Sequence, residues 1–580
     1  MATTRWLLIT MHTNASWAGG LIRYCYEQGV REFCIAPGSR SAPLAIACFH
    51  AKTYFPDIRL HTHYDERGLG FFALGLVRVG DAPVVVIATS GTAVANVYPA
   101  VVEAWQTCQP LWVMSADRPD SLLGCGANQA IQQKDLFGIN ANFSVNLTRP
   151  TNPQAWRGQV AMLAELGGTR GPAQLNCQFD EPLYQQPEDY LSGLAQPIPV
   201  VNVALEQAQH SVQTTGQKTV QKTAQVQGLR AFLQSFELSA SASTIVVLGA
   251  LSPGEADILG PWLRTLKCPI FADIGSQFRF GALPNVIAHA DLLLLKPAEV
   301  KPNRILQLGG RIVSKRINRW LPDAAENYFL LDQNNQKLDP SGKSTQYHVN
   351  YSEFVKYLPG DKLVSPVLQQ LLGSSEALGK RISAYLKGQW HEAVVCQQVM
   401  ASIEGRVALM PGNSLSIRML DSYSTQTKAQ ILVYANRGAS GIDGLLATAA
   451  ALAHGQFDYV VAVIGDTSLL HDINSLSLLS KSPLPVKLLV LNNDGGQIFA
   501  TLAAAQQEGF NALFAMPHGL EFSHACAQFS LEYRAVHTTE EFQGQCKAWL
   551  NSANSSVLEC RLLGGAEPLK HLVQRLSEPL

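Results

Sequence analysis

The sequence lacks an excess of charge of either sign. Its 580 residues include 44 Lys and Arg against 45 Asp and Glu, which leaves a formal net charge of −1. A protein that binds nucleic acid or an anionic membrane through bulk electrostatics needs a basic surplus, so the composition supports neither partner. Any anion must therefore be bound by a local group of residues.

Long apolar runs and paired cysteines are also missing. The longest apolar runs, Val84–Ala88 and Leu292–Leu295 among them, fall far short of the roughly 18 residues of a membrane span. Met1–Thr10 lacks a positively charged start, an adequate apolar run and a small-residue cleavage site, so we expect no secretory signal. The 11 cysteines form no CxxC pair, which favours reduced core thiols over a disulfide framework. These features predict a soluble, cytoplasmic protein.

The GxGxxG fingerprint of dinucleotide-binding domains is absent as well. Gly309-Gly310 follows a predicted strand but leads into residues 311–316, RIVSKR, and not to a third spaced glycine. An oxidoreductase that uses a nicotinamide cofactor needs this fingerprint in one of its α/β domains. The sequence therefore disfavours that class.

What the chain does contain is alternation of apolar strands and helices along most of its length. A chain of 580 residues is too long for one hydrophobic core and should divide into about three domains. We predict an α/β domain over 1–190, a Gln- and Thr-rich linker over 191–227, a central α/β domain over 228–355 and a third α/β domain over 356–580. The expected fold class is α/β, with three doubly wound parallel sheets.

The strands are identified by short apolar or alternating runs that end at Gly, Pro, Asp or Asn. The predicted strands are Glu32–Ala36, Arg59–Tyr64, Val84–Ala88, Pro110–Ser115, Gln174–Phe179, Thr244–Leu248, Ile270–Ala272, Arg304–Leu308, Tyr328–Leu331, Val407–Leu409, Ile431–Tyr434, Tyr459–Ile464 and Val486–Leu491.

The most informative stretch is residues 459–498. One buried strand stops at Gly465-Asp466, a helical segment follows, and a second buried strand ends in the string NNDGG, which contains Asn493. Because parallel strands end at the same edge of a sheet, Asp466 and Asn493 can converge on one hard cation. Mg²⁺ takes few protein ligands and completes its shell with water and phosphate oxygens, so the pattern suits a bound diphosphate. For Asp466 alone, a helix N-cap is the alternative.

Polar residues also follow the first two predicted strands. Ser39 and Arg40 lie at a Pro-Gly turn after the first strand, where open α/β sheets place ligands, although a solvated arginine is the alternative for Arg40. His61 and His63 share one face of the second strand, but two histidines without a third ligand are weak evidence for zinc. Glu66 ends that strand and begins a helix.

Two further segments follow strands in the later domains. Lys315 and Arg316 lie where a helix should begin, a position that suits either a solvated helix face or an anion contact. The string ANRGASGIDG, residues 435–444, lies between a strand and an Ala-rich helix. Glycine-rich turns let the backbone approach a ligand closely, although any one glycine can serve a tight turn alone.

The pattern GD followed by NN and a nearby glycine resembles the metal-diphosphate motif of thiamine-diphosphate enzymes. By that resemblance Asp466 and Asn493 bind Mg²⁺ or Mn²⁺ through their side chains and Gly495 binds it through its carbonyl. Thr467 replaces the glycine or alanine of many members and leaves both side-chain ligands in place. The strings DERGLG and VVVIATSGTAVAN resemble the pyrimidine-binding domain, in which the glutamate that matches Glu66 hydrogen-bonds the aminopyrimidine and activates the cofactor. A non-catalytic relative should have lost one of these residues.

Other strings resemble one branch of these enzymes, the 2-succinyl-5-enolpyruvyl-6-hydroxy-3-cyclohexene-1-carboxylate (SEPHCHC) synthases of menaquinone biosynthesis. They are PGSRSAPLA, SADRPDSLLGCGANQAIQQ, NRGASGIDGLLATAA and NNDGGQIF. The resemblance implies a transferase that decarboxylates 2-oxoglutarate and adds the succinyl unit to isochorismate. It also implies a homodimer as the minimal active unit and a homotetramer as the full assembly. The alternatives are the acetohydroxyacid synthase and oxidase branch, which often carries FAD, and other 2-oxoacid decarboxylases.

The same resemblance implies the substrate and cofactor contacts. Carboxylates are bound best by the guanidinium fork. The basic positions of the family fall on Arg40, Arg118, Lys315, Arg316, Arg418 and Arg437, and its polar partners fall on Ser39, Gln129 and Ser414. The residues expected beside the cofactor or the reacting carbons are Ser440, Gly441, Ile442, Ile498 and Phe499, of which Ile442 matches the bulky residue that bends the cofactor. We assign the 2-oxoglutarate carboxylate to Arg418 and Arg437 and the isochorismate carboxylates to the other four cations.

Overall fold

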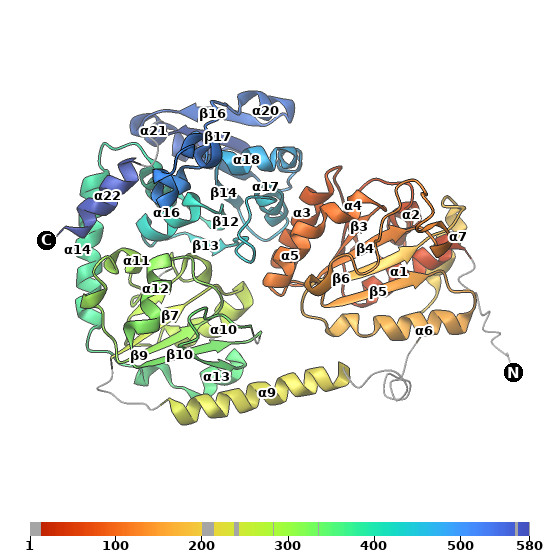
Figure 1. The fold of residues 1–580 in the computed structure, drawn as a ribbon, viewed down its shortest axis with the longest axis horizontal. Coiled ribbons are helices and arrows are strands. Elements are labelled where there is room, and N and C mark those ends of the chain that lie inside the picture. The colour runs from red at the N-terminus through yellow and green to blue at the C-terminus, as the bar shows by residue number, and fades with distance from the viewer. Residues whose placement is uncertain are drawn as a thin grey trace. The chain divides into compact units, whose positions relative to one another are not determined.

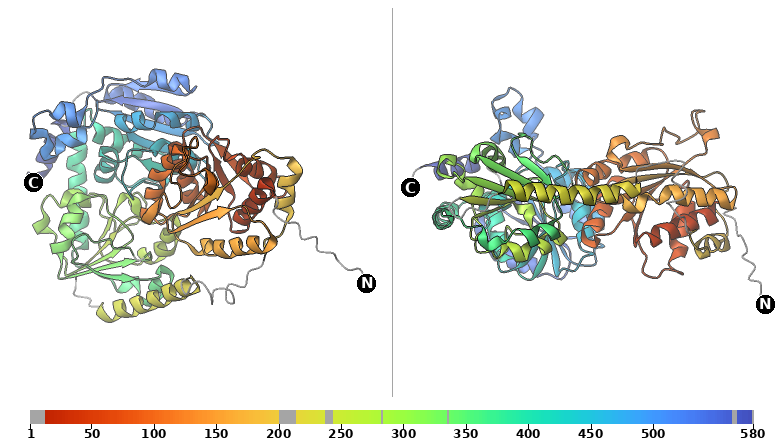
Figure 2. Two further views of the ribbon diagram at one scale, coloured as in Figure 1. Left: turned by 45° about the vertical axis from the view of Figure 1, so that its right-hand side comes forward. Right: turned by 90° about the horizontal axis from the view of Figure 1, so that it is seen from below.

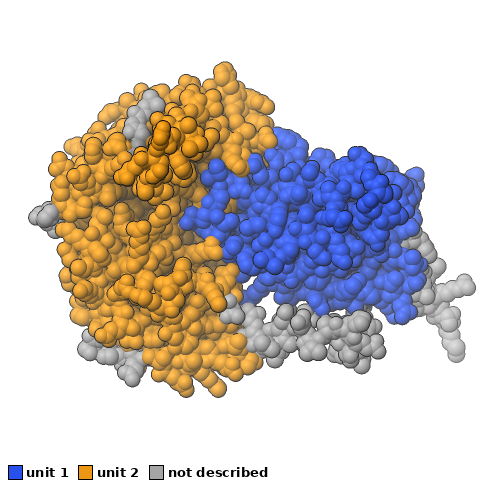
Figure 3. All heavy atoms as spheres, viewed as in Figure 1, with its two compact units in different colours: residues 1–218, 437–455 blue, residues 219–436, 456–580 orange. Residues whose placement is uncertain are grey.

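The computed structural model describes most of the chain. The described residues are 13–199, 214–236, 243–281, 283–334, 336–562 and 567–578, so the prediction for Met1–Thr10 lies outside them. Within these ranges no helix is both long and apolar enough to cross a membrane. The chain folds into two compact units, which are coloured in Figure 3. Unit 1 comprises residues 1–218 and 437–455, and unit 2 comprises residues 219–436 and 456–580.

Unit 1 contains a six-stranded parallel sheet in the order β2-β1-β3-β4-β6-β5. Its strands are β1 (Glu32–Ile35), β2 (Arg59–Thr62), β3 (Val84–Ala88), β4 (Leu111–Asp117), β5 (Phe143–Thr148) and β6 (Ala173–Gln178). The accompanying helices are α1 (Asn14–Glu27), α2 (Ala42–Ala51), α3 (Glu66–Gly80), α4 (Thr92–Asn96), α5 (Tyr98–Gln106), α6 (Pro153–Leu163) and α7 (Pro187–Ala195) (Figure 1). Strands β3 and β4 are buried along their whole length, as expected when helices cover both faces of a parallel sheet.

Unit 2 contains a five-stranded parallel sheet in the order β11-β10-β9-β7-β8. Its strands are β7 (Thr244–Leu248), β8 (Ile270–Ala272), β9 (Arg304–Leu308), β10 (Asn327–Asp332) and β11 (Thr345–His348). The helices around it are α9 (Thr214–Ser235), α10 (Pro253–Leu263), α11 (Ala290–Leu293), α12 (Lys315–Ala324) and α13 (Tyr351–Tyr357). Val246 and Leu248 enter one buried cluster and Ile245 and Val247 another, because side chains alternate along a strand. Both faces of this sheet are therefore covered.

The third sheet, also in unit 2, has six parallel strands in the order β13-β12-β14-β15-β17-β16. Its strands are β12 (Arg406–Pro411), β13 (Gln430–Val433), β14 (Tyr459–Gly465), β15 (Val486–Asn492), β16 (Glu532–Val536) and β17 (Ser556–Arg561). The helices of this part are α14 (Leu368–Leu386), α15 (Glu392–Ser402), α16 (Leu415–Tyr423), α18 (Asp466–His471), α19 (Leu476–Leu479), α20 (Ser523–Gln528), α21 (Thr539–Leu550) and α22 (Glu567–Ser577). Helix α17 (Leu445–Leu452) lies between β13 and β14 in sequence but belongs to unit 1.

The first and third sheets share one strand order, since both read 2-1-3-4-6-5 when their strands are counted in chain order. In each, the chain leaves the first strand for one edge and returns to place the third strand on the opposite side of the first. Ligands of open α/β sheets bind where the order reverses in this way, outside the carboxyl ends of the strands. The residues that follow β1 and β3, and those that follow β12 and β14, hold this position.

The α/β fold with parallel sheets is confirmed, and the predicted strands are found to within about two residues at either end. Strands β5, β11, β16 and β17 were not predicted from the sequence. The first three lie at sheet edges and are only partly buried, so their sequences carry many polar residues and a weak apolar signal. Strand β17 is buried at five of its six positions, and it was missed although its sequence is mostly apolar.

The linker predicted over 191–227 is partly helical. Helix α9 begins at Thr214 inside this range and is drawn as one continuous helix in Figure 2. Residues 200–213 lie outside the described part. The Gln-, Thr- and Lys-rich sequence of α9 has almost no amphipathic pattern, and composition alone therefore suggested a linker. The domain boundaries themselves stay a prediction.

Within unit 1, helices α3 and α17 pack closely at Gly75. A Cβ atom on Gly75 would lie 2.6 Å from Cβ of Ala451 and 2.9 Å from the carbonyl oxygen of Thr448. Thr448 also donates its hydroxyl hydrogen to the carbonyl of Phe71 at 3.3 Å. Only glycine therefore fits at this position of the helix pair.

Gly75→Ala should consequently lower the thermal unfolding midpoint, because overpacking of a well-packed contact costs about 1–3 kcal/mol. Gly80→Ala in the same helix is the matched control, since a Cβ there meets no atom within 4 Å. An alanine in a helix is otherwise worth roughly 0.5–1 kcal/mol over glycine, so the control should unfold at or above the wild-type midpoint. Equal midpoints for the two variants, measured by differential scanning fluorimetry, would contradict the α3–α17 contact.

Candidate active site

The carboxyl ends of β14 and β15 are joined by Asp466. This residue directly follows β14 and is 1% exposed. Its Oδ1 accepts a hydrogen bond from the N–H of Thr467 at 2.6 Å, and its Oδ2 accepts one from the N–H of Gly495 at 2.8 Å. Burial raises the pKa of the Asp466 carboxyl. Because the second bond crosses to the segment after β15, Asp466 is more than a helix cap.

Asn493 directly follows β15 and is held by a buried carboxylate. Its Nδ2 donates a hydrogen bond to Oε1 of Glu392 at 2.6 Å. Glu392 is the first residue of α15 and is 3% exposed. Burial raises the pKa of Glu392, and the negative charge of Asp466 raises it further. Asn493, Glu392 and Asp466 therefore form one polar cluster at the carboxyl ends of β14 and β15 in the third sheet.

His518 also contacts this cluster, through Asp466. Its Nδ1 accepts a hydrogen bond from the N–H of Leu520 at 2.9 Å, so in the neutral ring the proton lies on Nε2, which donates to Oδ2 of Asp466 at 3.2 Å. Asp494 Oδ1 accepts from the N–H groups of Gly519 at 2.7 Å and His518 at 2.8 Å. The first of these bonds makes the largest contribution to lowering the pKa of Asp494. The segment around residue 518 is thereby fixed against the metal motif.

The oxygen atoms of this cluster suit a hard cation. Among the described residues no three His, Cys, Asp or Glu side chains gather as a metal-binding group, so a cation here would take amide and carbonyl oxygens beside one carboxylate. Because Glu392 binds Nδ2 of Asn493, the oxygen is the amide atom left for a metal. Gly495 has φ +111°, and a Cβ there would lie 2.1 Å from the carbonyl of Ala515, so only glycine fits. The predicted residues therefore fit a Mg²⁺ ion that keeps most of its shell for water and phosphate.

Ser414 and Arg418 lie at the carboxyl end of β12. Ser414 precedes α16 with φ +71°, a left-handed conformation that non-glycine residues rarely adopt. The Nη1 of Arg418 donates a hydrogen bond to the carbonyl of Ser414. Both predicted substrate residues thus meet at the start of α16.

Arg316 is bound by a carboxylate that also contacts helix α16, which belongs to the third-sheet part of unit 2. Its Nη1 donates to Oδ2 of Asp291 at 2.5 Å. The same carboxylate accepts the hydroxyl of Ser314 at 2.5 Å and that of Ser422, in α16, at 2.9 Å. Asp291 therefore fixes Arg316 relative to α16, whereas Lys315 is exposed at the start of α12.

Ile498 and Phe499 belong to the short 3-10 helix η8 (Gln497–Thr501) after the metal motif. Ile498 packs partly against the core of the third sheet. Phe499 is 38% exposed, and its ring centroid lies 5.8 Å from that of Phe514. Of the two, Phe499 is the one that presents an apolar surface.

In unit 1, Glu66 is the first residue of α3 and is half-buried. The helix N-cap is its neighbour Asp65, whose side chain accepts hydrogen bonds from the N–H groups of Arg67 and Gly68 at 3.0 and 3.2 Å. The capping role that an acid at a helix start often has is therefore filled by Asp65. Glu66 is not needed for it.

The glycine-rich segment after Arg437 is anchored within unit 1 by Glu103 of α5. The carboxylate of Glu103 accepts hydrogen bonds from the N–H of Gly438 at 2.8 Å and the N–H of Ala439 at 2.6 Å, and it pairs with Arg78 at 3.2 Å. Ser440, at φ +61°, donates its hydroxyl hydrogen to the carbonyl of Arg437 at 3.4 Å.

The end of this segment places Ile442 before α17. Gly444, the residue before α17, has φ +65°, and a Cβ on it would lie 1.9 Å from the ring of Phe71 in α3. A Cβ on Gly441 would lie 2.0 Å from Oδ1 of Asp443. Ile442 is half-buried between these two constrained glycines. The segment is therefore held in one conformation by α3 and α5.

Arg40 and Ser39 follow β1. Arg40 donates through Nη1 to the carbonyl of Phe179 at 2.9 Å, and Nη2 lies 3.6 Å from Glu181. Its buried Nε has no hydrogen-bond partner. A buried guanidinium donor without a partner is costly, so Arg40 is well suited to an anionic ligand. Ser39 is exposed, with its hydroxyl 3.3 Å from that of Tyr184.

Arg118 and Gln129 are linked through Ser90, which follows β3. The Nη1 of Arg118 donates to Oγ of Ser90 at 2.6 Å and to the carbonyl of Gln129 at 2.7 Å. Gln129 Nε2 donates to the carbonyl of Ser90 at 2.8 Å. Burial lowers the pKa of Arg118, and the positive charge of Arg40 lowers it further. The two arginines therefore lie close enough to repel each other.

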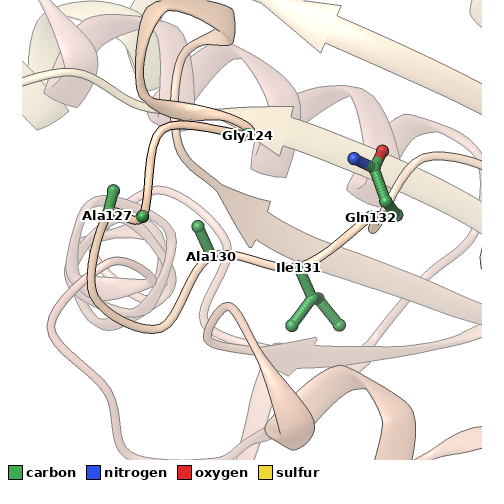
Figure 4. A pocket seen from close by; sticks show the side chains of 6 residues that line it. Gly124, Ala127, Ala130, Ile131 and Gln132 are labelled. Atoms are coloured by element: carbon green, nitrogen blue, oxygen red, sulfur yellow. The ribbon is translucent and has the colours of Figure 1, made fainter.

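A pocket of 240 Å³ is formed by the segment that contains Gln129 (Figure 4). It is lined by Gly124, Gly126, Ala127, Ala130, Ile131 and Gln132. This volume lies below the roughly 300–1,000 Å³ of typical ligand pockets. The pocket is therefore small.

The structure brings the predicted residues together in separate groups. Unit 2 joins Asp466, Asn493 and Gly495 in one cluster and Ser414 with Arg418 in another, and unit 1 joins Arg118 with Gln129 near Arg40. Sequence reasoning missed Glu392 and His518. Neither lies in a motif, and each reaches the cluster from a distant segment, so no local spacing could have indicated it.

Three family models match the chain. They are described as the thiamine pyrophosphate enzyme N-terminal TPP binding domain over residues 16–138, the middle domain of thiamine pyrophosphate over residues 213–409, and the thiamine pyrophosphate enzyme C-terminal TPP binding domain over residues 415–560. A solved structure of a putative thiamin diphosphate-dependent enzyme from Mycobacterium smegmatis has the same fold, with a TM-score of 0.65 over 95% of this chain and 99% of that one. At 15% identity, this likeness concerns the fold alone.

Full-length relatives are more similar in sequence. The SEPHCHC synthase of Halorhodospira halophila is 36% identical over 98% of this chain and 99% of its own length. The enzyme of the same name from Yersinia pestis bv. Antiqua is also 36% identical, over 97% of this chain and 98% of its own length. With this identity over nearly its whole length, and with the three thiamine-diphosphate enzyme domains in order, the chain belongs to the SEPHCHC synthase family.

Proposed function

We propose that this protein is a thiamine-diphosphate-dependent SEPHCHC synthase of menaquinone biosynthesis. It converts 2-oxoglutarate and isochorismate into SEPHCHC and CO₂. The relatives carry this name over their full length, which supports the reaction class. The observation that carries the proposal is the oxygen cluster of Asp466, Asn493 and Gly495 at the ends of β14 and β15, which fits a metal ion that bears a diphosphate.

Asp466, Asn493 and Gly495 would hold Mg²⁺ or Mn²⁺, and the metal would hold the diphosphate of the cofactor. The bound cofactor supplies the electron sink that allows a 2-oxo acid to lose CO₂. Asp466 contributes a buried negative charge and His518 holds its orientation. Ser440, Gly441 and Ile442 would contact the cofactor from a segment whose conformation is fixed by Glu103 and Phe71.

Glu66 would bind N1′ of the aminopyrimidine. A carboxylate in this position would favour the imino tautomer, whose exocyclic 4′-nitrogen could then take up the proton from C2 of the thiazolium ring. The proposal is supported by the position of Glu66 at the start of α3 and by Asp65, which provides the N-cap in its place. Among the residues that the structure describes, no other acid combines this placement with the matching motif.

The cations would bind the carboxylates of the two substrates. We assign the distal carboxylate of 2-oxoglutarate to Arg418 and Arg437, with Ser414. The isochorismate carboxylates fall to Arg40, Arg118, Lys315 and Arg316, with Ser39 and Gln129. Mutual repulsion between Arg40 and Arg118, together with the partnerless Nε of Arg40, supports an anionic ligand at that place. Ile498 and Phe499 would cover the reacting carbons and exclude water.

The assembly follows from the family resemblance. We propose a homodimer as the minimal active unit and a homotetramer as the full assembly. A cytoplasmic location stays a prediction from the sequence.

The reaction itself can be tested directly. Purified protein with thiamine diphosphate, Mg²⁺, 2-oxoglutarate and isochorismate should release CO₂ and yield a condensation product of the mass of SEPHCHC. Self-condensation of pyruvate in place of this product would instead indicate an acetohydroxyacid synthase.

Glu66→Gln should leave cofactor affinity nearly unchanged and slow hydrogen exchange at C2 of the bound cofactor, because an amide cannot favour the imino tautomer as a carboxylate does. The exchange is measured by NMR after quenching in deuterated buffer. Glu188→Gln, in the first turn of α7, is the matched control and should exchange like the wild type. Equal exchange rates for all three proteins would refute the assignment.

Asp466→Ala should weaken the binding of Mg²⁺ and thiamine diphosphate, because it removes the anionic ligand of a hard cation. Titration of the apoprotein by calorimetry measures the loss. Asp458→Ala is the control, since Asp458 flanks the opposite end of β14 and accepts a hydrogen bond from the N–H of Arg406 at 2.8 Å. Unchanged affinity in the Asp466 variant would mean that this carboxylate only joins the two strand ends.

Arg118→Ala and Arg418→Ala should impair different substrates. Loss of a charge-assisted contact costs about 1.5–3 kcal/mol, or roughly ten- to a hundredfold in affinity. Arg118→Ala should raise KM for isochorismate by that factor and spare the single-turnover release of CO₂ from 2-oxoglutarate. Arg418→Ala should slow the release of CO₂ first. If both variants impair the same substrate equally, the assignment of carboxylates to arginines is wrong.

A further inference from the structure

Two consecutive asparagines lie at the end of β15, Asn492 as its last residue and Asn493 directly after it, and a buried glutamate holds the amide of each. Asn492 Nδ2 donates to Oε1 of Glu559 at 2.7 Å, and Asn493 Nδ2 donates to Oε1 of Glu392 at 2.6 Å. Glu559 is fully buried and Glu392 is 3% exposed. A buried carboxylate destabilises the fold unless it is hydrogen-bonded or paired with an opposite charge, so each of these two pairs needs an explanation.

The reason for the first pair is structural. Glu559 lies on β17, and its Oε2 also accepts hydrogen bonds from the hydroxyl of Tyr533 at 2.7 Å and from the N–H of Phe522 at 3.2 Å. Its carboxylate therefore ties together β15, β16 and the start of α20. Asn492 is the last residue of β15, and its own Nδ2 makes a further bond to the carbonyl of Leu520 at 3.0 Å.

The second pair is different, because Glu392 binds the amide of Asn493, which is the proposed metal ligand. An asparagine amide has a donor end and an acceptor end of nearly the same shape, and only the oxygen can bind a cation. A carboxylate accepts hydrogen bonds and cannot donate them, so it binds the NH₂ end alone. If the amide of Asn493 were reversed, its oxygen would face an oxygen of Glu392 in a buried space and both would lack a donor.

We propose that Glu392 is a positioning residue of the metal centre: it fixes the amide of Asn493 so that Oδ1 points to the cation. The inference rests on the proposed function, since it takes Asn493 as a metal ligand. Partners behind a ligand commonly set its orientation, and their loss weakens metal affinity by about 10–100-fold. The start of α15 is therefore part of the metal centre although it lies far from the motif in sequence.

Glu392→Gln in the full-length protein tests this without a change of shape. A glutamine that donates its NH₂ hydrogen to Oδ1 of Asn493 favours the reversed amide, in which the oxygen is no longer offered to the metal. Affinity for Mg²⁺, titrated by calorimetry at saturating thiamine diphosphate, should fall about 10–100-fold. Glu559→Gln is the matched control, because it makes the same change behind the neighbouring asparagine and should leave the affinity within about threefold. A Glu392→Gln affinity within that margin would overturn the inference.

A second background keeps the test independent of folding defects. Asn493→Asp supplies a carboxylate ligand that faces Glu392 with like charge, and Glu392→Gln should then provide a donor to it. In that background Glu392→Gln should strengthen Mg²⁺ binding, the reverse of its effect in the wild type. A loss of affinity in both backgrounds would show a general structural role and overturn the inference.

Asn493→Ala separates this inference from the function on which it rests. If this variant binds Mg²⁺ as the wild type does, Asn493 is not a ligand and the proposed metal site is wrong. If Asn493→Ala weakens binding, Glu392→Gln should add nothing further in its presence, because Glu392 acts through Asn493. An additional loss of the same size as in the wild type would overturn the inference while leaving the metal site standing.

Discussion

The candidate site depends on one hydrogen bond between two strand ends, from the N–H of Gly495 to Oδ2 of Asp466 at 2.8 Å. It exists because β14 and β15 are parallel and in register, with Gly465 opposite Leu491, so that the polar residues after each strand leave the sheet at one edge. A shift of register by one residue would exchange the two faces of β15 and remove the bond. The apolar core that fixes this register is therefore also what positions the proposed metal ligands.

The same constraint operates in the first sheet, because both six-stranded sheets have one strand order. Arg40 follows β1 as Ser414 follows the equivalent β12, and Ser90 follows β3 as Asp466 follows β14. The topology supplies two equivalent switch points, and the residue types at each decide what it can bind. Around Arg118 they are cationic, which suits carboxylates, and around Asp466 they are acidic, which suits a metal.

The sequence predicts those parts of the site that a strand end defines. Asp466, Asn493 and Arg118 follow buried strands with a clear apolar signal, and parallel topology then brings neighbouring strand ends together. Glu392 and His518 could not be predicted, because their places depend on how α15 and the segment after η8 pack on the sheet. Edge strands such as β5 were missed for a related reason, since a half-covered strand needs few apolar residues. Helix α9 could not be predicted from periodicity, because it forms although its sequence has almost no amphipathic pattern.

In the protein without ligands, the charges around Asp466 and those around Arg118 are arranged unfavourably. Burial raises the pKa of Glu392 and the charge of Asp466 raises it further, whereas burial lowers the pKa of Arg118 and the charge of Arg40 lowers it further. In each case like charges oppose each other where burial weakens their solvation. A cation at the first group, or a carboxylate at the second, would relieve that repulsion. Because a ligand that binds only the folded state stabilises it, the unfavourable energy stored in each group becomes part of the affinity for the ligand. The near-neutral chain thus carries local groups of opposite charge at different strand ends.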